Sequence, residues 1–158
     1  MNLLNGCSLN KFPLHLQYVA DLIYFDGPLL SLFENQSGES YLYCWSDVNA
    51  VYNRWLVFRV TKNSLQNYLQ GQVSLRDLIL NPVDGFHYAI DIDNDLEVKN
   101  TFWVLPENLP DSYVPEEDSY HDPSLLNPER GEEDIKLIKN LIIPKKGNQV
   151  VVLTSEKL

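Results

Sequence analysis

The pattern of apolar and polar positions predicts an antiparallel sheet in the first part of the chain. Short apolar runs recur there, and turn-forming residues separate them, beginning with Asp26-Gly27, a dipeptide typical of hairpins. In one run, aromatic residues occupy alternate positions, as in a strand with one aromatic face, and the next run is apolar on both faces, as in a central strand. We therefore expect four strands joined as a meander, at residues 17–25, 29–34, 41–45 and 52–60.

Beyond residue 60 the period changes to that of a helix. Thr61 is placed to cap a short helix that ends at Gly71. A second helix begins at Ser74, which forms a capping-box pair with Asp77. Because both helices are too short to be stable alone, we expect them to pack on the sheet. Two further strands are predicted at residues 86–92 and 97–105.

The last third of the chain has a different composition. Residues 106–128 hold five prolines and few aliphatic residues, which predicts a long excursion or linker rather than a core element. The predicted fold class is α+β: an antiparallel meander sheet with two short helices packed on it, an acidic loop, and a C-terminal helix and strand. The predicted units are a single domain at 1–110, an acidic loop or linker at 111–131, and a helix with a β segment at 132–158 on the same domain.

Composition narrows the class of protein. A chain of 158 residues with 44% hydrophobic residues is long enough to bury one core, and its 11% aromatic residues argue against disorder over most of its length. Cys7 and Cys44 have no nearby cysteine or histidine at metal-ligand spacing, which favours free thiols in a reducing compartment. No apolar run approaches the roughly 20 residues that span a bilayer. We therefore expect a cytoplasmic protein that is not bound to a membrane.

Charge is concentrated in one segment. The net charge is −10, and residues 91–134 alone hold 14 acids and two bases. Such a segment repels phosphate backbones, which argues against direct nucleic-acid binding, and it attracts basic or mixed-charge protein surfaces. The alternative is a solvated loop that only aids solubility. The candidate partner-binding residues are Glu116, Glu117, Asp118 and Asp122.

Aromatic residues and one arginine suggest a second candidate site. Tyr, Trp and Arg dominate binding hot spots, but they also fill cores, so the aromatic strand either packs under the helices or forms a binding surface. Arg54 lies in an otherwise apolar strand and therefore needs a carboxylate partner, from Asp47, from Asp26 or from a ligand. The possible pocket residues are Arg54, Trp45, Tyr43, Asp26 and Asp47.

Acidic residues at alternate positions suggest a metal site only weakly. Asp91, Asp93, Asp95 and Glu97 resemble a calcium loop in spacing, but the glycine at the sixth position and the glutamate at the twelfth are missing. A hairpin turn with solvated acids is the favoured interpretation. We expect no resident metal and no cofactor.

Catalytic motifs do not occur in the sequence. No nucleophile elbow, zinc-binding helix or phosphate-binding glycine loop is present, so no catalytic residue is assigned, although novel chemistry stays open. His87 lies in an apolar strand, where a structural role is favoured over a general base. His121 lies among carboxylates that are expected to raise its pKa. The favoured interpretation is that it has no functional role, and the alternative is a pH-sensitive contact.

Four segments resemble a family of small uncharacterised bacterial proteins, described as a domain of unknown function. They read FDGPLLSLF from residue 25, YLYCWSD from residue 41, RWLVF from residue 54 and SLRDLI from residue 74, and the resemblance covers about residues 17–105. It implies a bacterial cytoplasmic protein and supplies no activity or site residue.

Two functions remain after these observations. The favoured one is a non-catalytic interaction or regulatory protein, similar to an antitoxin, immunity protein or inhibitor, that presents an acidic surface to a protein partner. The alternative is a small-molecule binding protein or hydrolase with an anionic-ligand pocket around Arg54.

Overall fold

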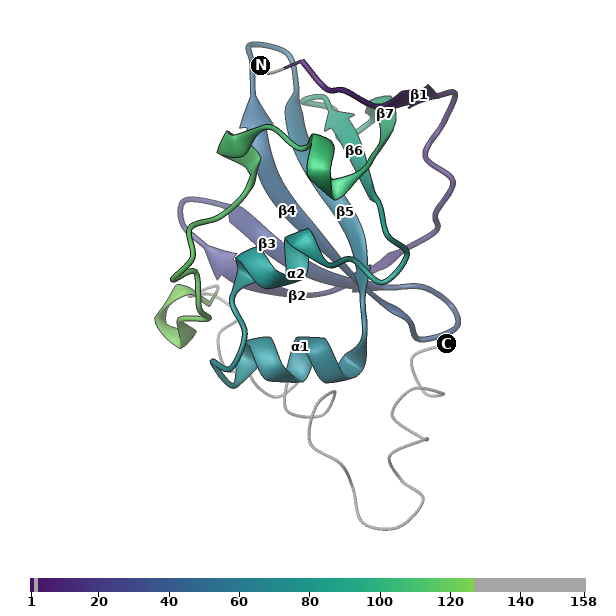
Figure 1. The fold of residues 1–158 in the computed structure, drawn as a ribbon. Helices are drawn as coiled ribbons and strands as arrows, with labels where there is room; N and C mark the ends of the chain where they lie inside the picture. The colour runs from purple at the N-terminus through teal and green to yellow at the C-terminus, as the bar shows by residue number, and fades with distance from the viewer. Residues whose placement is uncertain (2, 127–158) are drawn as a thin grey trace.

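One antiparallel sheet of seven strands organises the molecule (Figure 1). The computed structural model describes residue 1 and residues 3–126, so the predicted helix and strand at 132–158 lie outside the described residues. The strands lie in the order β1-β7-β6-β5-β4-β3-β2, and the meander predicted from the sequence is confirmed. Their bounds are β1 Cys7–Leu9, β2 Gln17–Tyr24, β3 Pro28–Glu34, β4 Ser40–Val48, β5 Asn53–Val60, β6 His87–Ile92 and β7 Val98–Val104.

Two short helices connect β5 to β6, and both begin as the sequence predicts. Helix α1 spans Lys62–Leu69, and the hydroxyl of Thr61 accepts a hydrogen bond from the Ser64 amide at 3.0 Å. Helix α2 spans Leu75–Leu80 and begins with the Ser74–Asp77 capping box. Neither helix, nor any other in the described part of the chain, is long and apolar enough to cross a membrane.

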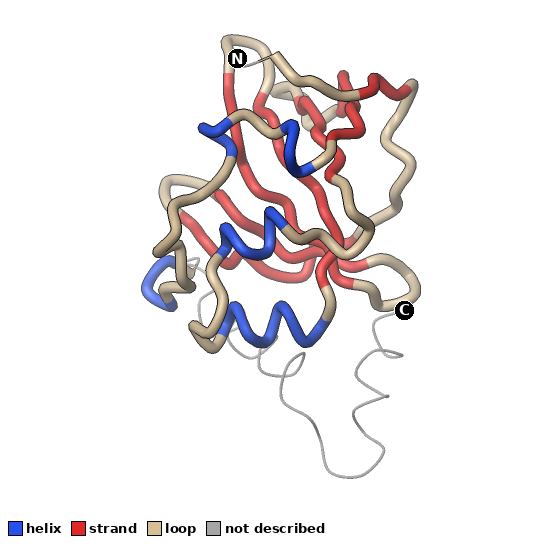
Figure 2. Tube along the Cα trace, viewed as in Figure 1, coloured by secondary structure: helices blue, strands red, loops and turns tan. Residues whose placement is uncertain are grey.

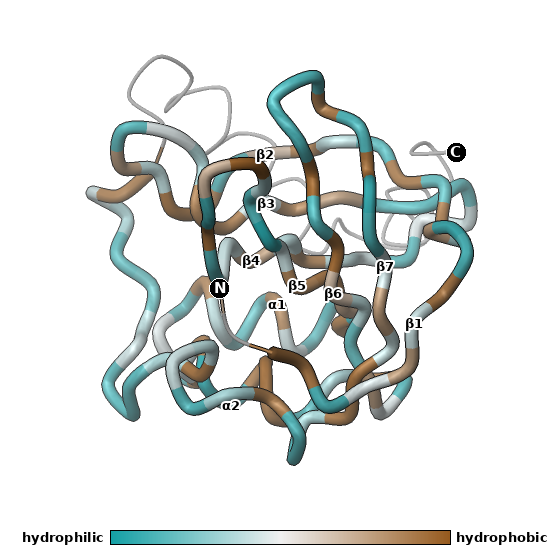
Figure 3. The backbone as a smooth tube through the Cα atoms, turned by 90° about the horizontal axis from the view of Figure 1, so that it is seen from above, coloured by the Kyte–Doolittle hydropathy of each residue, from teal (hydrophilic) through white to brown (hydrophobic). Residues whose placement is uncertain are grey.

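The two faces of the sheet carry different side chains. On β5 the alternate residues Leu56 and Phe58 point to the side that α1 and α2 cover, which we call the inner face, and they join the main buried cluster. Figure 3, seen from above, shows both helices on this one side of the sheet. The opposite side, the outer face, has its own smaller cluster around Tyr41, Val57 and Ile90. Phe12, Leu14 and Leu16, from the segment that links β1 to β2, pack against it.

The proline-rich segment after β7 contributes to the core. It contains no strand within residues 105–126, only the 3-10 turns η1 Pro106–Asn108, η2 Asp111–Tyr113 and η3 Pro123–Leu125, and the first two lie on the same side of the sheet as the helices (Figure 2). Leu109 and Tyr113 are nevertheless 7% and 3% exposed and belong to the main buried cluster. The expectation of an excursion outside the core is therefore corrected for these residues.

Candidate functional site

A row of four aromatic rings crosses the outer face from β2 to β5. Tyr18 meets Phe33 edge to face with ring centroids 5.7 Å apart, and Phe33 stacks on Tyr43 at 4.1 Å. Tyr43 in turn lies 6.5 Å from Trp55. The antiparallel register places these residues on neighbouring strands, with Phe33 opposite Tyr41 and Trp45 opposite Trp55. Aromatic side chains at alternate positions thus form a continuous band across four strands.

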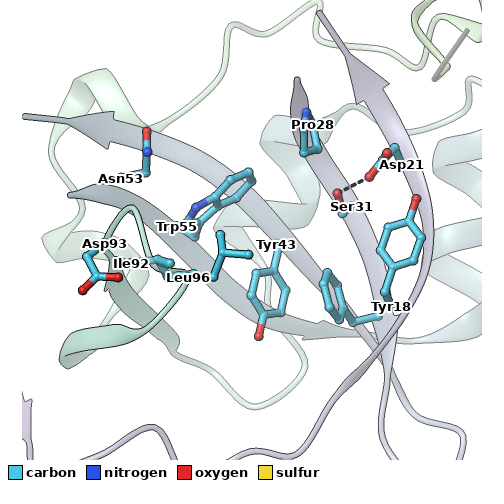
Figure 4. Close-up of a pocket in the computed structure, with 11 residues that line it drawn as sticks. Tyr18, Asp21, Pro28, Ser31, Tyr43, Asn53, Trp55, Ile92, Asp93 and Leu96 are labelled. Carbon is cyan, nitrogen blue, oxygen red and sulfur yellow. Dashed lines mark hydrogen bonds between the residues drawn. The ribbon is translucent and has the colours of Figure 1, made fainter. Parts of the chain in front are cut away.

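This band forms the floor of a hollow of about 280 Å³, which we call the outer-face hollow (Figure 4). Asp21 and Ser31 lie at one end, where the Ser31 hydroxyl donates a hydrogen bond of 2.7 Å to the Asp21 carboxylate. Asp21 is only 6% exposed. The lining residues are Tyr18, Asp21, Pro28, Ser31, Phe33, Tyr43, Asn53, Trp55, Ile92, Asp93 and Leu96.

The β6–β7 turn forms the other end of the hollow. Leu96 is 84% exposed and has a φ of 62°, a left-handed conformation that costs a leucine of order 1–3 kcal/mol. The Asp93 carboxylate accepts hydrogen bonds from the amides of Glu97 and Asp95, which lower the pKa of Asp93. The turn therefore holds an anionic group and an exposed apolar side chain at the rim.

Among the described residues that line the outer-face hollow, all the charged ones are acidic. Asp21 and Asp93 are its two charged residues, and no lysine, arginine or histidine lines it in the described part of the chain. Lys99 approaches from outside, with its ammonium 3.7 Å from the Asp93 carboxylate. Lys99 also pairs with Glu97 at 2.8 Å, so its single charge is shared between two acids.

Tyr43 also lines a second hollow on the outer face, of about 330 Å³. Its remaining walls come from Gln36 and from the segment that precedes β2, including Phe12, Leu14 and His15. The two hollows therefore meet at Tyr43, where burial raises the pKa of the phenol to about 12. An extended ligand would contact both hollows, whereas a small one would occupy either alone.

On the inner face, Arg54 is held by a buried network. Its guanidinium donates to both carboxylate oxygens of Asp91, at 2.7 and 3.0 Å, and to the Tyr113 hydroxyl at 3.1 Å. The Tyr113 hydroxyl donates to Asp47 at 2.7 Å. The bidentate partner is Asp91, which the sequence did not predict, and the pairing of β5 with β6 places it opposite Arg54. The predicted Asp47 lies opposite Arg54 on β4 and joins the network through Tyr113.

Burial and hydrogen bonding act in opposite directions on this network. Burial alone would lower the pKa of Arg54, but the hydrogen bonds to Asp91 and Tyr113 outweigh it and the pKa is raised. Burial, and then the hydrogen bond to Asp47, raise the pKa of Tyr113 to about 12. Arg54 also lies 5.3 Å from the centre of the Phe102 ring. The arginine is therefore fixed by a carboxylate, a phenol and an aromatic ring that the chain itself supplies.

The five residues of the predicted pocket do not form one site. Tyr43 lines both hollows of the outer face, and Trp45, on the same face, donates from its indole to Asn53 at 2.9 Å. Arg54 lies on the inner face with its network. Asp26 is exposed in the turn between β2 and β3, at a φ of 54°. The aromatic strand therefore does not pack under the helices, because α1 and α2 cover the opposite face.

The acidic repeat between β6 and β7 forms a turn, as the favoured interpretation predicts. Asp93 donates from its amide to the Glu97 carbonyl, and Leu96 donates to the Asp93 carbonyl. Asp91 is directed to Arg54 on the inner face. Asp95, the fourth member of the repeat, is exposed. No group of three metal-ligating side chains suited to an ion is found within residues 1 and 3–126.

The acidic residues proposed for partner binding lie on the helix side of the molecule. Glu116, Glu117, Asp118 and Asp122 are all exposed. The segment that carries them is anchored to α2, where Leu75 donates to the Ser119 carbonyl at 2.8 Å and Arg76 donates to the Pro115 carbonyl at 3.0 Å. These acids therefore have a defined position apart from the outer-face hollow.

Both histidines singled out in the sequence have lowered pKa values. His87 is fully buried against Phe58, donates from Nε2 to the Ile79 carbonyl at 2.7 Å, and has its pKa lowered by burial to about 4. His121 packs on Tyr68, and burial lowers its pKa more than the nearby Asp122 raises it. The expectation of a raised pKa at His121 is therefore wrong, because desolvation exceeds the effect of the carboxylate.

Sequence reasoning did not identify most of the outer-face hollow. Asp21 was the available signal, because a carboxylate in the middle of an apolar strand needs a local reason. Phe33 and Leu96 gave no such signal, since their roles depend on strand register and on the turn conformation. Trp55 directly follows Arg54 in the sequence but was not assigned to the predicted pocket.

Comparison with curated proteins and with solved structures gives no match. A family model matches residues 15–151. The match includes the segments that suggested the resemblance and extends beyond residue 105 through the acidic segment. The chain therefore belongs to this family of unknown function (DUF6575).

Proposed function

We propose that this protein is a non-catalytic interaction protein that binds a partner protein through the outer face of its sheet. The observation that carries the proposal is the aromatic band of Tyr18, Phe33, Tyr43 and Trp55, which lies on the face that α1 and α2 leave uncovered. Aromatic residues in partly exposed, well-packed positions are the usual anchors of protein interfaces.

The shape of the outer face favours an extended protein segment over a small metabolite. The two hollows have volumes of about 280 and 330 Å³, near the lower end of the range for small-molecule sites, and they adjoin at Tyr43. A segment of a partner would fill one hollow with each of two side chains. The alternative of an anionic ligand at Arg54 has less support, because the guanidinium already binds Asp91 through two hydrogen bonds.

The acidic residues Glu116, Glu117 and Asp118 act in this proposal as a steering surface for a partner with basic or mixed charge. We also propose a cytoplasmic location. The exposed free thiol of Cys7 supports it, since oxidising compartments tend to convert such thiols to disulfides.

An affinity capture with matched variants tests the proposed function. Tagged full-length protein is used to capture proteins from a lysate of its host, as wild type, as Tyr43→Ala and as Leu80→Ala. Leu80 is a matched control because it is 37% exposed on α2, on the other side of the sheet. Circular dichroism melting confirms that each variant is folded.

We expect one stoichiometric partner with the wild type and with Leu80→Ala, and its loss with Tyr43→Ala. Retention of the same partner by folded Tyr43→Ala, at the same yield as by the wild type, would refute binding through the outer face.

A further inference from the structure

We propose that the outer face binds an extended segment of the partner that carries apolar side chains at alternate positions and ends in a pair of basic residues. The apolar side chains fill the two hollows. The basic end leaves the sheet between the β2–β3 and β6–β7 turns, residues 25–27 and 93–96, which we call the hairpin tips. This inference rests on the proposed function, because it names the chemistry of the partner at the same face.

The hairpin tips border the outer-face hollow from two sides. Because successive strands of the meander run in opposite directions, both tips lie at the same end of the sheet. Pro28, directly after the first tip, and Leu96, in the second tip, both line the hollow. Figure 4 shows that Leu96 points towards the aromatic band. The tips therefore extend the aromatic surface beyond the ends of the strands.

Each hairpin tip combines an exposed apolar side chain with an exposed carboxylate. Phe25 is 75% exposed and precedes Asp26, and Leu96 is 84% exposed and follows Asp95. Neither Asp26 nor Asp95 forms an ion pair within the described part of the chain. Two acids that flank an apolar surface are complementary to a ligand with basic residues next to apolar ones.

Leu96 is a residue that the fold itself does not require. Its φ of 62° is a left-handed conformation that glycine and asparagine adopt at little cost, but leucine does not. At 84% exposed, its side chain adds almost nothing to the core. A strained and exposed leucine beside a hollow is therefore better explained by contact with a ligand than by stability.

The second hollow fixes the direction of the bound segment. It lies towards the β3–β4 turn, which contains Gln36, at the opposite end of the strands from the hairpin tips. Its described lining residues include Phe12 and Leu14 but no aspartate or glutamate, so it suits the apolar end. In an extended segment, alternate side chains share one face about 6.6–6.8 Å apart. Because both hollows have Tyr43 as a wall, two such side chains can enter one hollow each.

A fluorine NMR titration of the full-length protein tests this assignment. The three tryptophans are labelled as 5-fluorotryptophan, and each signal is assigned with a Trp→Phe variant. Trp55 lines the outer-face hollow and is the reporter, and Trp103, whose ring lies 5.0 Å from that of Phe86, is the internal reference. The probes are three acetylated and amidated peptides. FSFKK has the assigned pattern, FSFQQ lacks its charge, and SSSKK lacks its apolar side chains.

We expect FSFKK to shift the Trp55 signal in a saturable manner while the Trp103 signal stays unchanged. FSFQQ should bind about fivefold more weakly, because it cannot pair with the acids of the hairpin tips. SSSKK should bind about tenfold more weakly or not at all, because it leaves both hollows empty.

A matched pair of double variants tests the role of the acids. Asp26→Asn with Asp95→Asn should reduce the affinity for FSFKK to that for FSFQQ and leave the affinity for FSFQQ unchanged. Asparagine keeps the size of both side chains and tolerates the left-handed backbone at position 26. The control is Glu107→Gln with Asp111→Asn, which removes the same charge at two exposed positions in η1 and η2 and should leave all binding unchanged.

Leu96→Asn separates binding from stability. We expect it to weaken the binding of both FSFKK and FSFQQ by about threefold, because it removes an apolar contact at the rim. Its melting temperature should equal or exceed that of the wild type, because asparagine relieves the strained backbone. A residue with only a structural role would show the opposite pattern.

Three results would overturn the inference. The first is equal binding of FSFKK and FSFQQ, and the second is unchanged binding of FSFKK by the Asp26→Asn and Asp95→Asn double variant. The third is a Trp55 shift with single-stranded oligonucleotide but with none of the peptides, which would assign the face to base stacking. Each of these leaves the proposed function intact if folded Tyr43→Ala still loses the captured partner, so the two failures are distinguishable.

Discussion

The two faces of this sheet use similar side chains for different ends. On the inner face, a carboxylate and aromatic rings enclose Arg54, and the whole set is buried under η2. On the outer face, Asp21 and Asp93 flank a band of aromatic rings without a basic residue among the lining side chains that the structure describes. The difference teaches that similar side chains are enclosed by η2 on one face but form a partly exposed aromatic band on the other, which is the face that we propose as the binding surface.

The largest effect should come from breaking the inner cluster. Arg54→Ala leaves Asp91 as a buried carboxylate without its bidentate partner, and we expect the free energy of unfolding to fall by about 3–5 kcal/mol. Arg59→Ala is the control, because Arg59 is partly exposed and its pairs with Glu39 and Asp84 are worth at most about 1 kcal/mol. Denaturant unfolding measures both. Equal losses for the two variants would contradict a structural role that is special to Arg54.

A second, smaller change in the free energy of unfolding should appear as the pH is lowered, and it too arises from a residue on the inner face. The pKa of His87 is about 4 in the folded protein, whereas an unfolded histidine has a pKa of about 6.5. The unfolded state therefore binds the proton more readily, so the stability from neutral His87 is complete above about pH 6.5 and is lost as the pH falls towards 4. We expect this loss to be about 3 kcal/mol.

His87→Gln tests this pH dependence, since glutamine can still donate to the Ile79 carbonyl but does not titrate. Unfolding free energies between pH 7 and 4 should vary less for this variant than for the wild type, by about 3 kcal/mol. His15→Gln, at an exposed histidine before β2, is the matched control. An identical pH profile for His87→Gln and wild type would show that burial of His87 does not limit stability in acid.

The smallest effect concerns the acidic residues outside both clusters. Neutralising Glu116, Glu117 and Asp118 together should slow association with a basic partner by a few fold and flatten its salt dependence, while the dissociation rate stays the same. Stopped-flow or surface-based association kinetics at two salt concentrations would measure this. An unchanged association rate would indicate that these residues form a solvated segment that only aids solubility.

Local signals in the sequence predicted most elements of the fold. The helix starts at Thr61 and Ser74 follow from capping chemistry within four residues, and the hairpin at Asp26-Gly27 follows from turn propensity. Strand β1 was missed because three partly polar residues carry no periodicity, and its pairing with β7 joins distant parts of the chain.

The candidate site was less predictable, because it depends on long-range register. Arg54 meets Asp91 only because the chain returns from α2 to place β6 beside β5, 37 residues later. The same pairing decides which face the helices cover, and therefore that Tyr43 and Trp55 stay on the uncovered side. Alternation along β4 and β5 identified an aromatic face but carried no information on which side would be covered.

The most direct test of this comparison is the partner capture with matched variants on the two faces of the sheet. The account predicts that folded Tyr43→Ala, on the outer face, loses the captured partner, while Leu80→Ala, on α2, retains it at the yield of the wild type. Equal retention of the partner by the two variants would contradict the claim that the outer face of the sheet is the binding surface.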